Sequence, residues 1–466
     1  MKKKTEPDCS NDTIVAISTP RGEGALAIVR MTGCQAIPMA DGVFQGHRAL
    51  REATSHTVHH GLIIDPRGDR AIDDVLLSVM RAPGTYTGED MIEISCHGGV
   101  LVTGKILQLL LRQGARLAAP GEFTRRAYLN GHMDLLQAEA VAEVIRSKTD
   151  AGLEAAQRQL RGGCSDRLKS IRRDLIESLA LVEAGLDFSD QELPEDVAGR
   201  AGEPLSRSRE ALSKLLQGAQ LGRQLREGFT VALVGRPNVG KSSLFNALLG
   251  SDRVIVAPTP GTTRDTVSEQ ISLKSLPVKM VDTAGLHAAA EQVDQEGVRR
   301  TRQQMEAADL LIVILDGSEP LQPQDIEILE ETKGQKGLVL INKIDLPRML
   351  AGRDMGGMGD SRPLIEASAK RGDGIDAAAD VIGAALRNGH GNGAENPLVA
   401  TLRHQEILRQ ALEAVRRAGR GMRAGAGEEL VAEDIRDALS AMAEMTGPAG
   451  GQEVLDQIFH TFCVGK

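Results

Sequence analysis

Residues Gly235 to Ser242 read GRPNVGKS and constrain the fold of this chain more than any other segment. They join an apolar run, Phe229 to Val234, to a segment that favours a helix, Ser243 to Leu249. A glycine-rich turn in this context predicts a P-loop, in which backbone N–H groups surround phosphates, Lys241 contacts the β and γ oxygens and the Ser242 hydroxyl binds Mg²⁺. The predicted nucleotide contacts are Asn238, Val239, Gly240, Lys241, Ser242 and Ser243.

A second motif predicts the base of the bound nucleotide. It is Asn342-Lys343-Ile344-Asp345, which follows the apolar run Leu338 to Ile341. The carboxylate of Asp345 can accept two hydrogens from the N1 and N2 edge of guanine, and adenine does not offer them. Three further motifs stand in the order that a GTPase requires: Thr262-Thr263, Asp282-Thr283-Ala284-Gly285 and Ser368-Ala369-Lys370. Together they predict a Ras-like P-loop GTPase domain with GTP and Mg²⁺ as ligands.

The same motifs predict how hydrolysis is controlled. Thr263 would complete the Mg²⁺ shell and the Gly285 N–H would contact the γ-phosphate, so both loops would order with GTP and relax after hydrolysis. Leu286 stands where a Ras-type enzyme has the Gln that orients the attacking water. Asn238 offers a side-chain carbonyl that could ligate a monovalent cation and replace the charge of an arginine finger. The alternative is that Asn238 only stabilises the turn of the loop.

The charge and the aromatic content argue against a broad nucleic-acid surface. The net charge is −9 at pH 7, aromatic residues make up 2% of the chain and Trp is absent. Because cationic side chains neutralise phosphates and aromatic rings stack on bases, we expect a partner to share the binding of any nucleic-acid substrate.

The five cysteines form no CxxC pair, which indicates reduced thiols in a cytoplasmic protein. No segment approaches the ~20 apolar residues of a membrane span, so no membrane attachment is predicted.

The pattern along the chain predicts a multidomain α/β protein. Short apolar runs between glycine turns predict an N-terminal α+β domain, and apolar residues at helical spacing from Leu160 to Leu186 predict one long helix. A second helical block follows a Gly- and Asn-rich linker, Asn388 to Asn396, and Met349 to Pro363 predicts a mobile loop. We expect the two helical blocks to pack as one bundle, with the GTPase domain inserted between them in sequence. The predicted domains are 1–121 (α+β), 122–226 (first helical block), 227–388 (GTPase) and 389–466 (second helical block).

Four segments outside the GTPase motifs resemble signatures of one family, the tRNA-modification GTPases called MnmE or TrmE. They are Asp12 to Ala16, Gly88 to Gly99, Pro120 to Gly131 and Phe462 to Lys466, so the similarity spans nearly the whole chain. The resemblance implies a homodimer that works with a flavoprotein resembling MnmG (GidA) in a heterotetramer, with FAD and NADH in that partner only. It implies addition of an aminomethyl or carboxymethylaminomethyl group to C5 of the wobble uridine of tRNA. It also implies that the N-terminal domain binds tetrahydrofolate.

The resemblance also implies roles for individual residues, at the positions of this sequence that match the family's motifs. The resemblance implies that Asn238 ligates K⁺ where two GTPase domains meet, and that Asp294, where the family usually has Glu, positions water. The K⁺ and nucleotide loop would comprise Ala257, Pro258, Thr259, Pro260, Gly261, Thr262 and Thr263, with Ala257, Thr259 and Thr262 as metal contacts beside the Mg²⁺ ligands Ser242 and Thr263. The contacts to 5,10-methylene- or 5-formyl-tetrahydrofolate would be Arg30, Glu93, His132 and Lys466, with Cys463 as a further site candidate. His132 stands where the family commonly has Lys or Arg.

Two other functions are compatible with a GTPase domain. One is a GTP-dependent RNA or ribosome assembly factor resembling Era or Der, although the chain has no basic KH-type module and one set of GTPase motifs. The other is a folate-binding protein whose nucleotide turnover is vestigial, although every nucleotide-contacting position is occupied by a suitable residue.

Overall fold

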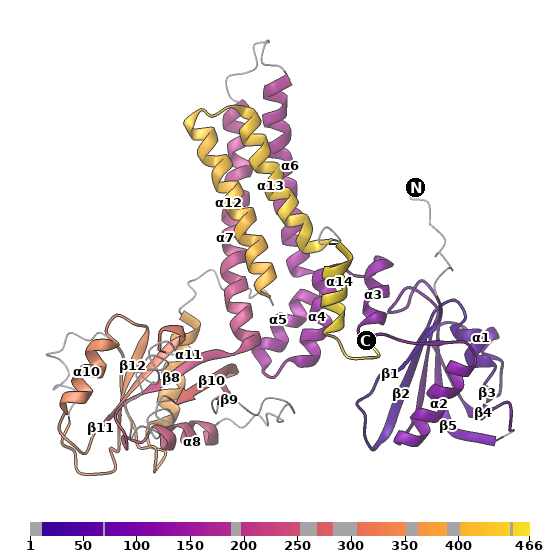
Figure 1. Ribbon diagram of the computed structural model, residues 1–466, viewed down its shortest axis with the longest axis horizontal. Helices are drawn as coiled ribbons and strands as arrows, with labels where there is room; N and C mark the ends of the chain where they lie inside the picture. Colours follow the sequence, from indigo (N-terminus) through magenta and orange to yellow (C-terminus); the bar gives the residue numbers. More distant parts are fainter. Residues whose placement is uncertain are drawn as a thin grey trace. The chain divides into compact units, whose positions relative to one another are not determined.

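The computed structural model describes residues 12–68, 70–187, 197–251, 268–282, 305–350, 362–388, 401–447 and 451–466. Contacts divide the chain into two compact units, Met1–Ala142 with Ala443–Lys466 and Glu143–Met442. The two ends of the chain therefore belong to one unit, and the middle of the chain forms the other (Figure 1).

A seven-stranded sheet forms the body of the first unit, with the order β3-β4-β5-β6-β2-β1-β7. All neighbouring strands are antiparallel except β1 and β7. Alternate residues of β5, such as Val75, Leu77 and Val79, are buried because successive side chains of a strand point to opposite faces. The strands are β1 (Ile14–Ile17), β2 (Gly24–Thr32), β3 (Phe44–Gly46), β4 (Thr57–Asp65), β5 (Arg70–Met80), β6 (Met91–Gly98) and β7 (Arg116–Leu117).

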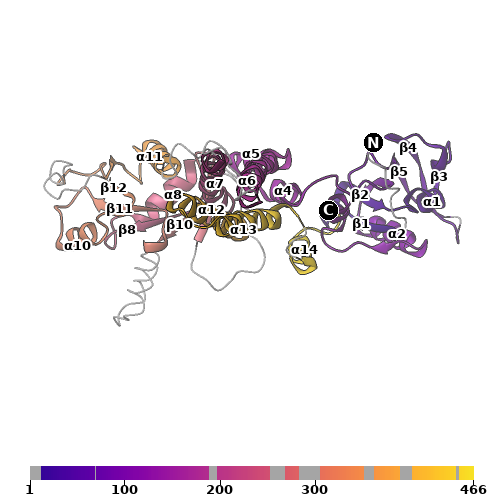
Figure 2. The same ribbon diagram turned by 90° about the horizontal axis from the view of Figure 1, so that it is seen from above.

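Helix α2 covers one face of this sheet (Figure 2) and buries Ile106, Leu109 and Leu110 against it. Helix α14 contacts α3, and the last residues of the chain continue along the first unit: the Gly121 N–H donates to the Cys463 carbonyl at 3.4 Å. The helices of this unit are α1 (Ala36–Asp41), the 3₁₀ turn η1 (Leu50–Glu52), α2 (Val100–Arg112), α3 (Glu122–Leu129) and α14 (Gly451–His460), and α4 (Leu135–Arg146) crosses its boundary.

Long helices make up one region of the second unit. Helix α7 contacts both α6 and α12, and Arg417 of α12 forms ion pairs with Asp434 and Asp437 of α13. Two helical segments that are separated in sequence by the GTPase motifs therefore lie side by side (Figure 1). These helices are α5 (Asp150–Leu160), α6 (Gly163–Asp187), α7 (Val197–Glu227), α12 (Leu402–Ala424) and α13 (Glu428–Thr446).

The apolar stripe predicted on one helix from Leu160 is divided between two helices. Leu160 is the last residue of α5, and α6 begins at Gly163. Gly162 has a φ of 87°, a left-handed conformation that interrupts an α-helix. The prediction of one helix is therefore wrong at its start, although Leu168, Ile171 and the residues that follow them on α6 form the expected buried stripe.

A six-stranded sheet forms the other region of the second unit, with the order β13-β12-β11-β8-β10-β9 and only β9 antiparallel to its neighbour. Every residue of β11 is buried, as expected for a parallel strand covered on both faces. The strand order reverses at β8, and ligands of open α/β sheets bind at the carboxyl ends of the strands at such a point. The elements are β8 (Phe229–Val234), α8 (Lys241–Ser251), β9 (Ser268–Leu273), β10 (Leu276–Asp282), β11 (Leu310–Asp316), α10 (Pro323–Glu331), β12 (Gly337–Asn342), β13 (Leu364–Glu366) and α11 (Ile375–Asn388).

Two predicted connecting segments fall largely outside the described residues. These are the linker, apart from Asn388 at the end of α11, and residues 351–361 of the predicted mobile loop. Leu350, at the start of that loop, is buried, and its N–H donates to the Gly317 carbonyl at 3.2 Å.

Candidate nucleotide-binding site

The turn between β8 and α8 follows a path that only glycine allows at two positions. A Cβ on Gly235 would lie 2.5 Å from the Ile314 carbonyl oxygen, and a Cβ on Gly240 would lie 2.2 Å from Asn342 Nδ2. Gly240 also has a φ of 99°, where side chains are rarely tolerated. Asn238 has a φ of 64°, a left-handed conformation that asparagine adopts more readily than most residues. Neighbouring backbone and side-chain atoms therefore hold the loop in a tight turn.

The lysine of this loop is held in place by the loop itself. Lys241 is only 4% exposed, and its Nζ donates to the carbonyl oxygens of Gly235 at 2.7 Å and Arg236 at 2.6 Å. Arg236 in turn donates through Nε to Asp325 Oδ1 of α10 at 2.8 Å. Lys241 is also the first residue of α8, so the positive end of the helix dipole adds to its charge and favours binding of an anion.

The side chain of Asn342 connects three segments at the edge of the sheet. Its Nδ2 donates to the Val239 carbonyl of the P-loop at 2.8 Å, and its Oδ1 accepts from the Ala369 N–H at 3.0 Å. Asn342 is the last residue of β12 and is 2% exposed, and its hydrogen bond to Val239 is buried. The P-loop and the two predicted base-binding motifs therefore meet at one residue.

Asp345 is oriented by Ser368. The buried Ser368 hydroxyl donates to Asp345 Oδ1 at 2.6 Å, and the Ser368 N–H donates to the Asp373 carbonyl at 2.8 Å. The hydrogen bond from Ser368 lowers the pKa of Asp345, so this carboxylate is charged at neutral pH and accepts hydrogens only. A fixed pair of acceptor oxygens suits the two adjacent donors of guanine. Ile344 and Lys370 lie beside it, partly or fully exposed.

Asp316, which no sequence motif singled out, completes this edge. It is the last residue of β11, and its Oδ2 accepts from Lys343 Nζ at 2.5 Å. Burial opposes ionisation of Asp316, but the hydrogen bonds from Lys343 and Ser318 outweigh it and lower its pKa. The signal was present in the sequence, because Asp316 ends an apolar run just as Asn342 does.

Only some of the residues predicted to lie near Mg²⁺ are among those that the structure describes. Ser242 lies in the first turn of α8, and Asp282 ends β10 in register with Leu233 of β8, beside the P-loop. Hydroxyl and carboxylate oxygens are the ligands that Mg²⁺ prefers, so these residue types fit the ion. The remaining predicted residues lie outside the described residues: Ala257, Pro258, Thr259, Pro260, Gly261, Thr262, Thr263, Thr283, Ala284, Gly285 and Asp294.

In the first unit, three residues that the resemblance selected lie together. Arg30 forms a two-point ion pair with Glu93, at 2.7 and 2.8 Å, and its Nη1 donates to the Gly465 carbonyl at 3.2 Å. Lys466 Nζ lies 5.8 Å from the centre of the Tyr86 ring, and Arg30 Cζ lies 5.8 Å from the same centre. Burial lowers the pKa of Lys466, and the charge of Arg30 adds to the effect. The cluster thus offers two cations, one carboxylate and an aromatic face.

The other two candidates of this unit make different contacts. The His132 ring lies against Gly88, where a Cβ would come within 2.8 Å of Nε2. Cys463 is exposed, and its carbonyl accepts from Gly121, so its backbone helps to hold the C-terminal segment. Neither residue is placed by these contacts beside Arg30.

No helix in the described ranges is long and apolar enough to span a bilayer. Among solved structures, the G domain of the T. maritima FeoB iron transporter matches 34% of this chain and 98% of its own, at 27% identity and a TM-score of 0.26.

Two family models together match most of the chain. The one described as MnmE helical domain matches residues 135–463, and the one described as GTP-binding protein TrmE N-terminus matches residues 13–132. Curated relatives named tRNA modification GTPase MnmE are 41% identical in Lacticaseibacillus paracasei and Geobacillus kaustophilus and 40% identical in Enterococcus faecalis. Each aligns over 98% of this chain and 98% or 99% of its own length. The resemblance drawn from the motifs is thereby confirmed, and the chain belongs to the MnmE family of tRNA modification GTPases.

Proposed function

We propose that this chain hydrolyses GTP as one component of the C5 modification of tRNA wobble uridine, in which an aminomethyl or carboxymethylaminomethyl group is added. The observation that carries the proposal is the Asn342 bridge, which joins the P-loop of this chain to a base site suited to guanine. The chain also aligns over 98% of the length of an MnmE relative. Mass spectrometry of tRNA nucleosides from a strain that lacks the chain tests it. Loss of the C5-modified wobble uridine is expected, and unchanged modification would refute the proposal.

We propose the following roles for individual residues during hydrolysis. Lys241, fixed by two loop carbonyls, would contact the β and γ oxygens and stabilise the charge that develops there. Ser242, Asp282 and Thr263 are the oxygen ligands that we assign to Mg²⁺, which supplies further charge neutralisation when bound. Asp294 would orient water, although its side chain is one methylene shorter than the Glu usual in the family. An Asp294→Asn variant that keeps full hydrolysis would remove Asp294 from this role.

We further propose that K⁺ activates hydrolysis when two GTPase domains of a homodimer meet. Asn238 supports this proposal, because its left-handed backbone lies in the phosphate loop and its side-chain carbonyl is a neutral oxygen donor. Ala257, Thr259 and Thr262 would add oxygen ligands. Turnover measured in K⁺ and in Na⁺ tests the ion requirement, and equal rates in both would refute it. Light scattering of the chain with K⁺ and a GTP transition-state mimic tests dimerisation.

A tetrahydrofolate derivative, 5,10-methylene- or 5-formyl-tetrahydrofolate, is the proposed one-carbon donor of the first unit. The donor set fits such a ligand, because the Glu93 carboxylate suits the N–H edge of a pterin and the cations of Arg30 and Lys466 suit folate carboxylates. The Tyr86 ring, whose centre lies 5.8 Å from Arg30 Cζ and from Lys466 Nζ, supplies an aromatic face. Calorimetry with 5-formyl-tetrahydrofolate should show binding that Glu93→Gln weakens, and equal affinity in that variant would place the folate elsewhere.

The flavin chemistry of the reaction is assigned to a partner. We propose a cytoplasmic heterotetramer with an MnmG (GidA)-like flavoprotein that carries FAD and NADH, while tRNA is the shared substrate. Copurification of the full chain with that flavoprotein, followed by size measurement, tests the assembly. Separate elution of the two proteins at micromolar concentration would contradict it.

A further inference from the structure

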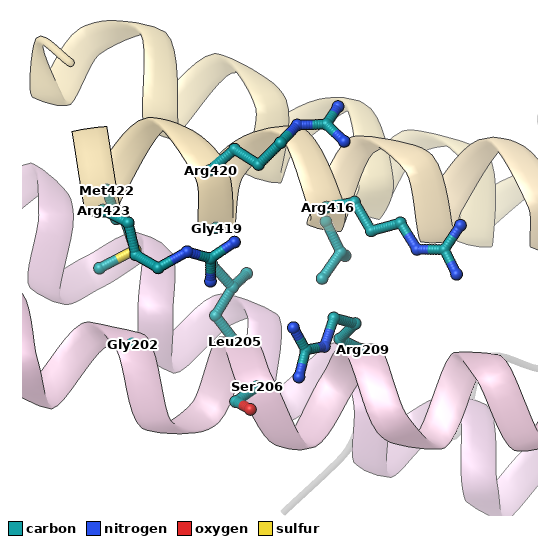
Figure 3. A pocket seen from close by; sticks show the side chains of 10 residues that line it. Gly202, Leu205, Ser206, Arg209, Arg416, Gly419, Arg420, Met422 and Arg423 are labelled. Carbon is teal, nitrogen blue, oxygen red and sulfur yellow. The ribbon is translucent and has the colours of Figure 1, made fainter. Parts of the chain in front are cut away.

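A pocket of about 500 Å³ lies between α7 and α12 in the second unit (Figure 3). Four arginines line it: Arg209 from α7, and Arg416, Arg420 and Arg423 from α12. The spacing of the three arginines on α12, four and then three residues, places them on one face of that helix. Leu205, Val415 and Met422 supply the apolar lining. The pocket is therefore strongly cationic in a chain whose net charge is −9.

Few carboxylates compensate these charges. Arg420 and Arg416 share Glu413, at 2.9 and 3.9 Å. Arg209 and Arg423 form no ion pair with any carboxylate among the residues that the structure describes, and Figure 3 shows both side chains extending into the space between the helices. Like charges that face one another across a pocket repel, and a bound anion would remove that repulsion.

The nearest acids of α7 are paired with other cations. Glu203 accepts from Arg207 at 3.2 Å, and Glu210 accepts from Lys214 at 2.7 Å. These acids are therefore held in other pairs along their own helix. The positive field of the pocket is left for a ligand from outside.

The chemistry of the pocket favours phosphate. Guanidinium groups are planar, permanently charged and match two phosphate oxygens at once. Arg416 to Arg423 extend over ~10 Å of helix at 1.5 Å per residue, enough for more than one phosphate of a continuous backbone. Arg209 is exposed and lies 18 residues before Glu227, the end of α7, or ~27 Å from the start of the GTPase sheet. The pocket is thus separate from the nucleotide site.

We propose that these arginines bind the phosphodiester backbone of RNA, and that this RNA is the tRNA on which the chain acts. The identity of the RNA rests on the proposed function, whereas the phosphate chemistry rests on the pocket alone. Arg209 and Arg423 contribute the strongest contacts, because neither forms an ion pair with a carboxylate among the described residues.

The test compares two double variants of the full chain. Arg209→Gln/Arg423→Gln removes the two pocket arginines that form no ion pair among the described residues. Arg172→Gln/Arg173→Gln removes two exposed arginines of α6 with the same change in net charge. Fluorescence anisotropy with labelled tRNA at several KCl concentrations gives the affinity and its salt dependence. We expect the pocket variant to bind about tenfold more weakly at ~150 mM salt, with the slope of log K against log salt reduced by about 1.5, as loss of two phosphate contacts requires. The control variant should match the wild type, and GDP affinity should be unchanged in both.

Other outcomes would overturn the inference. Equal weakening by both double variants would mean that only net charge matters. If the pocket variant keeps tRNA binding but loses pyrophosphate binding, the pocket takes a small phosphorylated ligand. If it keeps tRNA binding but loses poly-L-glutamate binding, the pocket takes an acidic protein. None of these results affects the proposed function, which the tRNA nucleoside analysis of the strain lacking the chain tests separately.

Discussion

The side-chain amide of Asn342 donates a hydrogen bond to the Val239 carbonyl oxygen at 2.8 Å and thereby joins the base site to the phosphate loop. The two residues are 103 positions apart in the chain. Because the same side chain also accepts from Ala369, one residue sets the distance between the two regions of the site that would hold the two ends of a nucleotide. We therefore expect the binding of guanine and the binding of phosphate to depend on one another.

Replacing Asn342 by Ala should weaken both folding and nucleotide binding. The change leaves the Val239 carbonyl and the Ala369 N–H without their partner in a buried place, at a cost of about 1–3 kcal/mol for each unsatisfied polar group. We expect urea unfolding of the nucleotide-free chain to shift to lower denaturant and GDP affinity to fall by about tenfold or more. A variant with normal GDP affinity would show that the bridge is not needed for the site.

Gly240→Ala and Gly250→Ala form a matched pair in one segment. At Gly240 the new Cβ would meet Asn342 Nδ2 at 2.2 Å and the backbone has a φ of 99°, so GDP binding should be lost or reduced at least about 100-fold. At Gly250, inside α8, a Cβ would meet no atom of the described residues within 4 Å, and alanine should stabilise the helix by up to ~1 kcal/mol. GDP titration and thermal unfolding measure both. Equal behaviour of the two variants would contradict the close approach seen at Gly240.

Asp345→Asn should change the preferred base from guanine to xanthine. The carboxylate would accept two hydrogens from guanine, whereas the amide of Asn can donate and suits xanthine, which has an oxygen in place of the exocyclic amine. We expect GTP affinity to fall by about 100-fold or more and XTP affinity to exceed it, because a mismatch of donors in the bound complex costs several kcal/mol. The measurement is competition of GTP and XTP for a fluorescent nucleotide. Retained preference for GTP would show that Asp345 does not contact the base.

Two substitutions of Asn238 separate its backbone role from its proposed role as a cation ligand. Asn238→Gly keeps the left-handed conformation, at a φ of 64°, and removes only the side-chain carbonyl; Asn238→Ala removes the carbonyl and adds about 1 kcal/mol of backbone strain. If the side chain ligates K⁺, both variants should lose stimulation of hydrolysis by K⁺ while still binding GDP. If glycine keeps the stimulation and alanine loses it, Asn238 acts through the turn alone.

The protonation of Lys466 should respond in opposite directions to its two charged neighbours. Its pKa lies below 10.5 because of burial first and the charge of Arg30 second, while Glu93 raises it. The folded chain therefore releases this proton at lower pH than the unfolded chain, and stability from this group rises with pH between the two values. Arg30→Met should raise the pKa and Glu93→Gln should lower it further. The pH profile of amine-reactive labelling at Lys466 measures both, and identical profiles would place its charge outside the cluster.

Strands and helices were predictable from the sequence where the pattern of apolar residues begins and ends with the element itself. The run Phe229–Val234 forms β8 with the predicted bounds, because an apolar run between turn residues has few other ways to be buried. The break between α5 and α6 was missed, because the apolar spacing continues across Gly162 while the backbone conformation there does not.

The sequence by itself determined the P-loop, the guanine motif and the family, because these depend on residue types at fixed short spacings. Only the tertiary structure decided that Asn342 spans the site to Val239, that Asp316 holds Lys343, and that the C-terminal Gly465 lies against Arg30. These contacts join residues 27 to 435 positions apart, and no local spacing encodes them. They arise when parallel strands bring their carboxyl ends to one edge and when the last helix returns the chain to its first unit.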